Sequence, residues 1–161
     1  MPEQNRNPTR THFLVQDNLL REEIEQWLRP HFPDPSEIGF HSGGAETCPP
    51  TYVMAVCVSE LPSDSYVQTI LSAHERKVAC GIIVRVQSRA TWQKLAELHM
   101  QRRFCFVVAV GGPREGLNKM FPRAAIEPVA ELKAPGRHVA RFIWNAAEAY
   151  TPLPLPYASN S

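Results

Sequence analysis

YVMAVCV (residues 52–58), VACGIIV (residues 78–84) and FCFVVAV (residues 104–110) are the three apolar runs that decide the fold class of this chain. Each run is too continuous for a strand that has one face in water. Strands that are buried on both faces have continuous apolar sequences of this kind, and they occur in parallel sheets that are covered by helices. The segment 51–110 therefore predicts three buried, parallel strands.

Helical patterns separate these runs. Ser63 and Ser88 are the cap candidates, and apolar residues follow each of them at helical spacing. Right-handed crossovers then give a βαβαβ unit. We therefore expect an α/β fold with three layers and a mainly parallel sheet, with one helix before the core and one after it.

The segments around this core predict the domain organisation. Residues 1–15 are expected to form a flexible arm, and residues 16–50 a helix followed by a connector rich in Pro and Gly. Residues 51–150 form the α/β domain, which includes a short helix near 115–121 and a strand near 126–132. Pro128 lacks an amide donor, which favours an edge position for that strand. Residues 151–161 are a proline-rich tail that favours polyproline II.

The first helix carries an apolar stripe. Asp17 can cap it, and Leu20, Ile24 and Trp27 fall on one face. The simplest interpretation is a face that packs against the domain. The alternative is that Leu20, Ile24 and Trp27 bind a partner.

Composition limits the class of protein. The chain has 161 residues and a formal net charge of +1, with seventeen Lys plus Arg against sixteen Asp plus Glu. This length predicts one domain, and the near balance of charge does not indicate a nucleic-acid binder. No apolar run reaches the length of a membrane span, and the first residues lack a signal-peptide core. We expect a cytoplasmic protein, or a periplasmic one if its start has been trimmed.

The carboxyl ends of the core strands are the first candidate site, because open parallel sheets bind ligands there. The residues that follow the strands are Ser59, Arg85, Gly111, Gly112 and Arg114. Guanidiniums and the amides of a glycine turn could bind an anionic or phosphorylated ligand. The sequence here is neither a Walker loop nor G-x-G-x-x-G, so ordinary turns are the competing interpretation.

A second candidate is the pair Glu131 and Lys133, which has the E-x-K spacing of metal-dependent nuclease sites. Alternate residues of a strand point the same way, so both side chains would lie on one face. The tripeptide is common by chance, and a second acidic ligand would have to come from Glu60 or Glu127.

Cysteine and histidine do not predict a metal or a cofactor. Three of the four cysteines (Cys57, Cys80 and Cys105) lie within the buried runs, where Cys acts as a small hydrophobe. The histidines are scattered, and His41 with Glu46 and Cys48 is the one loose cluster, at a spacing that matches no common zinc pattern. We expect no catalytic residue, no metal and no cofactor.

Three segments carry a resemblance to a known family: YVMAVCVSELP (52–62), GIIVRV (81–86) and MFPRAAIEPV (120–129). They resemble the thioredoxin-like pilus-assembly family of F-type conjugative type IV secretion systems. The resemblance covers about half of the chain. It implies a non-catalytic, thioredoxin-like scaffold for assembling a bacterial secretion machine, since the redox C-x-x-C is not present.

The expectation is a non-enzymatic accessory or interaction protein whose partner is another protein or a second copy of the chain. The first alternative is an enzymatic or ligand-binding domain that uses the strand ends for an anionic ligand. The second is the nuclease with Glu131 and Lys133.

Overall fold

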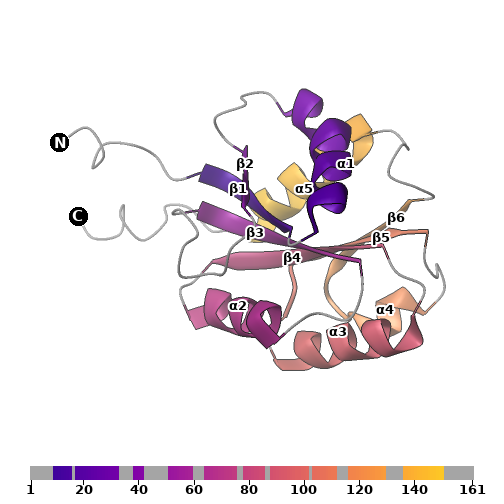
Figure 1. The fold of residues 1–161 in the computed structure, drawn as a ribbon. Helices are drawn as coiled ribbons and strands as arrows, with labels where there is room; N and C mark the ends of the chain where they lie inside the picture. The colour runs from indigo at the N-terminus through magenta and orange to yellow at the C-terminus, as the bar shows by residue number, and fades with distance from the viewer. Residues whose placement is uncertain are drawn as a thin grey trace, which may run out of the picture.

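The computed structural model describes residues 9–15, 17–32, 38–41, 51–59, 64–75, 78–85, 88–101, 103–111, 116–129 and 136–150. They form an α/β fold around one six-stranded sheet with the strand order β2-β1-β3-β4-β5-β6 (Figure 1). Every neighbouring pair of strands is parallel. The strands are β1 (Thr9–Val15), β2 (Ile38–His41), β3 (Thr51–Val58), β4 (Ala79–Val84), β5 (Phe106–Val110) and β6 (Ala125–Val129).

The three apolar runs are strands β3, β4 and β5, and they are neighbours in the sheet. All six residues of β4 and all five of β5 are buried. Helices α2 (Asp64–Glu75) and α3 (Arg89–Gln101) connect these strands. The predicted βαβαβ core and its parallel pairing are therefore confirmed.

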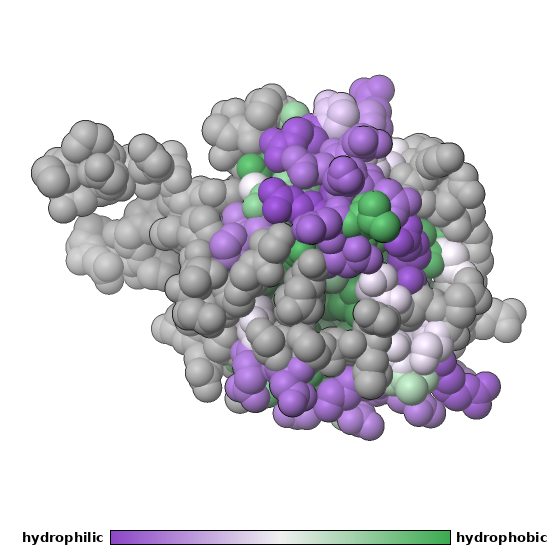
Figure 2. Space-filling model, in the orientation of Figure 1, coloured by the Kyte–Doolittle hydropathy of each residue, from purple (hydrophilic) through white to green (hydrophobic). Residues whose placement is uncertain are grey.

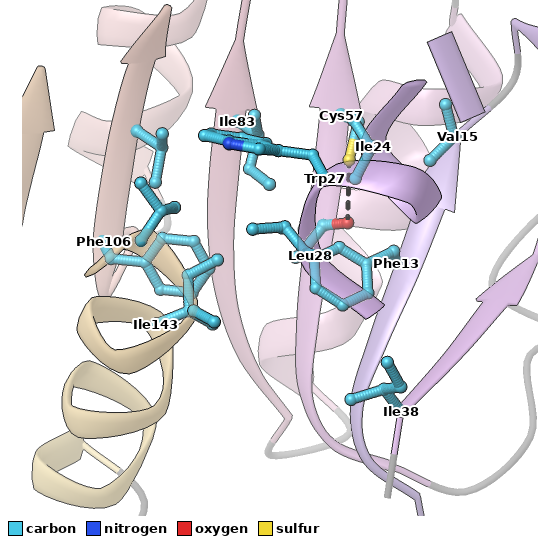
Figure 3. Packing of buried hydrophobic residues seen from close by; sticks show 14 of the residues in the cluster. Phe13, Val15, Ile24, Trp27, Leu28, Ile38, Cys57, Ile83, Phe106 and Ile143 are labelled. Carbon is cyan, nitrogen blue, oxygen red and sulfur yellow. Dashed lines mark hydrogen bonds between the residues drawn. The ribbon is translucent and has the colours of Figure 1, made fainter. Parts of the chain in front are cut away.

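Two layers of helices cover the sheet. Helices α1 (Asn18–Leu28) and α5 (Gly136–Tyr150) lie on one face, while α2, α3 and the short α4 (Leu117–Met120) lie on the other (Figure 1). Each face has its own apolar cluster. Figure 3 shows the first cluster, in which Ile24 and Trp27 of α1 and Ile143 of α5 meet side chains of the sheet.

Residues 9–15 depart from the expected flexible arm, because they form β1 between β2 and β3. Phe13, Leu14 and Val15 are fully buried, and Thr11 and His12 are buried beside them. Because Thr11 and His12 are polar, the apolar run of this strand is only three residues long. A run this short does not predict a strand from the sequence alone.

Strand β2 lies within the segment that was expected to be a connector. It is four residues long, and its Phe40 ring stacks on Phe13 of β1 at 4.9 Å between ring centroids. Strands this short carry little periodicity, so glycine and proline dominate the sequence pattern around them. The tail expected at 151–161 lies outside the described residues.

Helix α1 begins where the sequence predicts. The Asp17 carboxylate accepts a hydrogen bond from the Leu19 amide at 3.0 Å, as an N-cap does. Leu20, Ile24 and Trp27, the candidate partner-binding residues, are at most 6% exposed. Removing Leu20 or Ile24 from the core would cost about 1.5–3 kcal/mol each. This stripe is therefore the packing face of α1.

Strand β6 is at one end of the sheet, and Pro128 belongs to it, so the predicted edge position is confirmed. The sheet is parallel throughout the described residues, and this topology does not confirm a thioredoxin-like arrangement.

Candidate functional site

The strand order creates a topological switch point between β1 and β3. Strand β1 has β2 on one side and β3 on the other, and the helices that follow β1 and β3 cover opposite faces (Figure 1). Ligands of open parallel sheets bind beside the carboxyl ends of strands at such a point. Ser59 follows β3 there, and Arg85 follows the neighbouring β4.

Arg85 has an ionic partner at this edge. Its Nη1 lies 2.7 Å from Oε1 of Glu23, which is on α1. The two side chains are 35% and 49% exposed, so the pair is a surface ion pair that contributes modestly to stability. Because Glu23 already neutralises Arg85, this guanidinium is a weak anchor for an anion.

The glycine turn after β5 is also engaged. Gly111 has a φ of 65°, and its amide donates a hydrogen bond to the Val129 carbonyl at 2.8 Å. The Gly111 amide is therefore already hydrogen-bonded to strand β6 and is not available to a ligand. Gly112 and Arg114, the other two residues proposed for this site, lie outside the described residues.

The buried cysteines carry free thiols. Cys57, Cys80 and Cys105 are at most 7% exposed. Burial raises the pKa of all three thiols, that of Cys105 to about 12. A thiol attacks or binds metal as the thiolate, so these three behave as core residues.

The nuclease pair Glu131 and Lys133 lies outside the described residues, and so do Glu46 and Cys48 of the loose cluster. Glu127, one suggested second acidic ligand, has its Oε2 2.8 Å from Nε2 of His138. Within the part of the chain that the structure describes, no three His, Cys, Asp or Glu side chains gather as a metal site would require.

Two buried histidines differ in their surroundings. The Nδ1 of His99 accepts a hydrogen bond from the Phe104 amide at 3.0 Å, so its Nε2 donates to the Pro122 carbonyl at 2.8 Å. His12 is 4% exposed, and neither of its ring nitrogens has a partner among the described residues. Burial, then His41 and Arg21, lower the pKa of His12 to about 4.

The structure also has a pocket away from the strand ends, beside helix α5. It has a volume of about 530 Å³ and lies between α5 and the short 3-10 helix η2 (Arg29–His31) that follows α1. Its lining residues are His31, Phe32, Arg137, Ala140, Arg141, Trp144 and Asn145. None of these described lining residues carries a carboxylate.

The charged groups among the described lining residues are cationic. Arg137 and Arg141 are one helical turn apart on α5, and both are exposed. Neither has a hydrogen-bonding or ionic partner within the described ranges. His31 lies opposite them on η2.

Trp144 is the aromatic wall of the same pocket. It is half-buried, and its ring centroid lies 6.4 Å from that of Phe32. Phe32 in turn meets Phe13 of β1 edge to face at 6.2 Å, so the indole is supported by the core. The pocket therefore combines an aromatic surface that the core supports with two exposed cations.

Gly136 allows the two sides of the pocket to pack closely against each other. A Cβ atom built there would collide with the Trp27 carbonyl oxygen and would approach the His31 ring to 2.9 Å. Only glycine lets the start of α5 come this close to the end of α1. The pocket exists at this place because that approach is tight.

Neither candidate site predicted from the sequence includes the arginines of α5. In the structure Val139, Ala140 and Ile143 face the core, as an apolar stripe predicts. The available signal was the spacing of Arg137, Arg141 and Trp144 at i, i+4 and i+7, which puts them on one side of a helix. The opposite wall of this pocket comes from η2. The periodicity of the local sequence does not show that η2 and α5 lie next to each other.

The outer surface around α1 is mainly hydrophilic, and so is the rim formed by α3 (Figure 2). The large exposed hydrophobic residues of the described chain are Leu19 and Met100, which lie on different helices. The described helices are each too short or too polar to cross a bilayer.

Comparison with protein-family models, with curated proteins and with solved structures gives no match for this chain.

Proposed function

We propose that this protein is a non-enzymatic binding domain that docks an acidic segment of a partner protein in the pocket between η2 and α5. The observation that carries the proposal is the pair Arg137 and Arg141. They have no ionic partner in the described chain, and they flank Trp144 in a pocket whose described lining residues include no carboxylate.

The chemistry of the pocket favours carboxylates. A guanidinium presents its N–H donors as a planar fork that fits a carboxylate with two hydrogen bonds. Arg137 and Arg141 are one turn apart and can bind two carboxylates of an extended segment. Arginine keeps its proton at every physiological pH, so these groups support binding and not proton transfer.

A protein partner fits the pocket better than a small molecule. Sites for small molecules are enclosed and largely apolar, whereas Arg137 and Arg141 are exposed at the rim of this one. Tryptophan and arginine are also the residues that most often dominate binding between proteins. Trp144 offers an apolar surface to one side chain of the partner segment.

The strand ends are the weaker candidate for an anionic ligand. Arg85 is paired with Glu23, and the Gly111 amide is bonded to Val129. A scaffold role in a secretion apparatus stays a prediction of the family resemblance. It would be one case of the binding role proposed here.

The test is fluorescence anisotropy with a fluorescein-labelled peptide in which Glu and Asp alternate with Phe. The full chain is expected to bind this peptide, and the double substitution Arg137→Glu with Arg141→Glu is expected to weaken binding by about tenfold or more. The matched control is Arg89→Glu. Arg89 is exposed at the start of α3, on the other face of the sheet. That variant should bind within about twofold of the parent chain, since rim charges far from a site have small effects.

Salt provides an independent measurement. Raising the salt concentration should weaken the parent chain's binding and leave the residual binding of the double variant nearly unchanged. The proposal is wrong if the peptide does not bind the parent chain, or if Arg89→Glu weakens binding as much as the double variant. A DNA duplex that binds more tightly than the peptide at equal salt would also contradict it.

A further inference from the structure

His12 is a buried polar group whose hydrogen-bonding capacity is unused. An imidazole has two ring nitrogens, and each needs a donor or an acceptor when it leaves water. Both nitrogens of His12 are buried without a partner in the described structure. Leaving such a group unpaired is unfavourable, so the site calls for a ligand that the described residues do not supply.

A second imidazole lies beside it. His41 is on β2, and the register pairs His12 with Gly39 and Leu14 with His41. His12 and Leu14 point to the same face because side chains alternate along a strand, and paired residues share a face. His12 and His41 are therefore diagonal neighbours on the face that carries Leu14, with ring centroids 5.4 Å apart and planes inclined by 58°.

This separation fits two rings that bind one metal ion. With Zn–N bonds of about 2.1 Å and a tetrahedral angle at the metal, the centres of two ligating rings are about 5 Å apart. The rings are tilted and not stacked, so their nitrogens can converge on a common point. The His99 ring, which lies 5.7 Å from that of Phe104, has both nitrogens bonded and offers no such site.

We propose that His12 and His41 form a two-histidine site for a divalent transition-metal ion, with Zn²⁺ as the best candidate. Imidazole nitrogens suit zinc, copper and nickel, and they are poor ligands for magnesium or calcium. Strand β2 is at the end of the sheet, and His41 is only partly buried, so an ion can reach the pair from that side. Water or an anion completes the coordination at the positions that the two imidazoles leave open.

The test is isothermal titration calorimetry of the EDTA-treated, dialysed full chain with ZnCl₂. One equivalent is expected to bind, and His41→Ala is expected to weaken this binding by more than about tenfold, as the loss of a ligand does. His41→Ala is the primary variant because His41 is only partly buried and lies on the end strand β2, where truncation removes less core packing than it would at His12. His12→Phe is the second variant, since a ring of similar size fills the buried position.

His138→Ala is the matched control. His138 is exposed on α5, and its imidazole is paired with Glu127, far along the sheet from β2. This variant should bind zinc within about twofold of the parent chain. Nitrogen-15 spectra of histidine-labelled protein provide a structural readout, because zinc should move the ring-nitrogen signals of His12 and His41 and leave those of His99 in place.

Two outcomes overturn the proposal. The first is a parent chain that binds no zinc, or whose His12 and His41 signals do not move when zinc is added. The second is zinc binding that persists unchanged in His41→Ala, which would assign the ion to other ligands such as thiolates. A variant His12→Phe that fails to fold changes neither criterion, since His41→Ala and the spectra decide the question.

Discussion

Within one chain, two buried imidazoles have opposite surroundings. His99 ties the end of α3 to the chain around Phe104 and Pro122 with both of its nitrogens. His12 lies in β1 with neither nitrogen bonded in the described structure. The first is a structural residue. The second is a group whose protonation the protein resists, and this difference has a measurable consequence.

Folding stability is expected to fall below pH 6.5 because of His12. The pKa of His12 is about 4 in the folded chain against 6.5 for an ordinary histidine, so between these values only the unfolded chain takes up the proton. The contribution is fully present above pH 6.5. It is lost as the pH falls toward about 4, with a slope of up to about 1.4 kcal/mol per pH unit. Urea unfolding at a series of pH values, in EDTA, measures it.

The variant His12→Phe isolates this effect from the carboxylates that also titrate at low pH. Its stability should depend less steeply on pH between 6.5 and 4 than that of the parent chain. His31→Ala, which changes an exposed histidine of η2, should keep the parent slope. Equal slopes for the parent chain and His12→Phe would contradict the assignment to His12.

At the scale of the element, helix α5 has three separate roles along its length. Gly136 starts it against α1, Val139 and Ile143 pack it on the sheet, and Arg137 and Arg141 face the pocket. Because one rigid helix carries all three, a change at its first residue should also displace Arg137, which follows it directly, and Arg141, which lies one turn further along.

Substituting Gly136→Ala is expected to destabilise the chain and to weaken binding of the acidic peptide. The added Cβ would collide with the Trp27 carbonyl oxygen, which is backbone and cannot swing away. Overpacking of this kind costs about 1–3 kcal/mol. Relief of the clash would move α5 away from η2 and widen the pocket. Urea unfolding gives the stability, and anisotropy with the labelled peptide gives the affinity.

Gly116→Ala is the control for this prediction. The φ of 83° at Gly116 would strain an alanine, but nothing lies within 4 Å of the new Cβ. Gly116 precedes α4, which covers the opposite face of the sheet from α5, so it lies far from the pocket (Figure 1). It should lose stability while the peptide affinity stays unchanged. A peptide affinity that Gly136→Ala leaves intact would show that α5 does not position the arginines.

The same scale explains what the sequence could predict. Strands β3, β4 and β5 have long apolar runs, and helix α1 has an acidic cap with apolar residues at helical spacing, so their local patterns are strong. Strands β1 and β2 are short or interrupted by Thr11, His12 and Gly39, so only pairing across the sheet makes them strands. Secondary structure that depends on distant partners leaves little trace in the local sequence.

In the candidate sites too, local features could be predicted from the sequence, and contacts between distant segments could not. The sequence located the strand ends, and the structure brings Ser59, Arg85 and Gly111 to neighbouring strands. It could not show that Glu23 of α1 reaches Arg85, because 62 residues separate the two in the chain. It also could not show that η2 and α5 meet at Gly136, since that approach is a property of packing.

At the scale of the whole molecule, the sheet depends on its amino-terminal strand. Strand β1 pairs with both β2 and β3, so it joins β2 to the rest of the sheet. Phe13 and Val15 also belong to the cluster beneath α1 and α5. A segment that looks like an arm in the sequence is thus part of the centre of the fold.

Deleting residues 1–15 is expected to abolish cooperative folding, because it removes β1 and exposes the edge of β3 and the α1 stripe. Deleting residues 1–8 leaves β1 whole and is the matched control, which should retain a cooperative transition. Circular dichroism during thermal unfolding distinguishes the two. A chain without residues 1–15 that still unfolds cooperatively at the parent temperature would show that β1 is dispensable.

The place of β1 in the sheet also sets the order of events when the chain is made. Thr9 pairs with Thr51, so β1 must wait for its partner β3, which is synthesised 42 residues later. At about 5–20 residues per second this delay is about 2–8 seconds. During that time only the four-residue strand β2 can pair with β1, and the side of β1 that pairs with β3 stays open. The nascent chain therefore carries an apolar strand with one open edge, which is the state in which a chaperone would meet it.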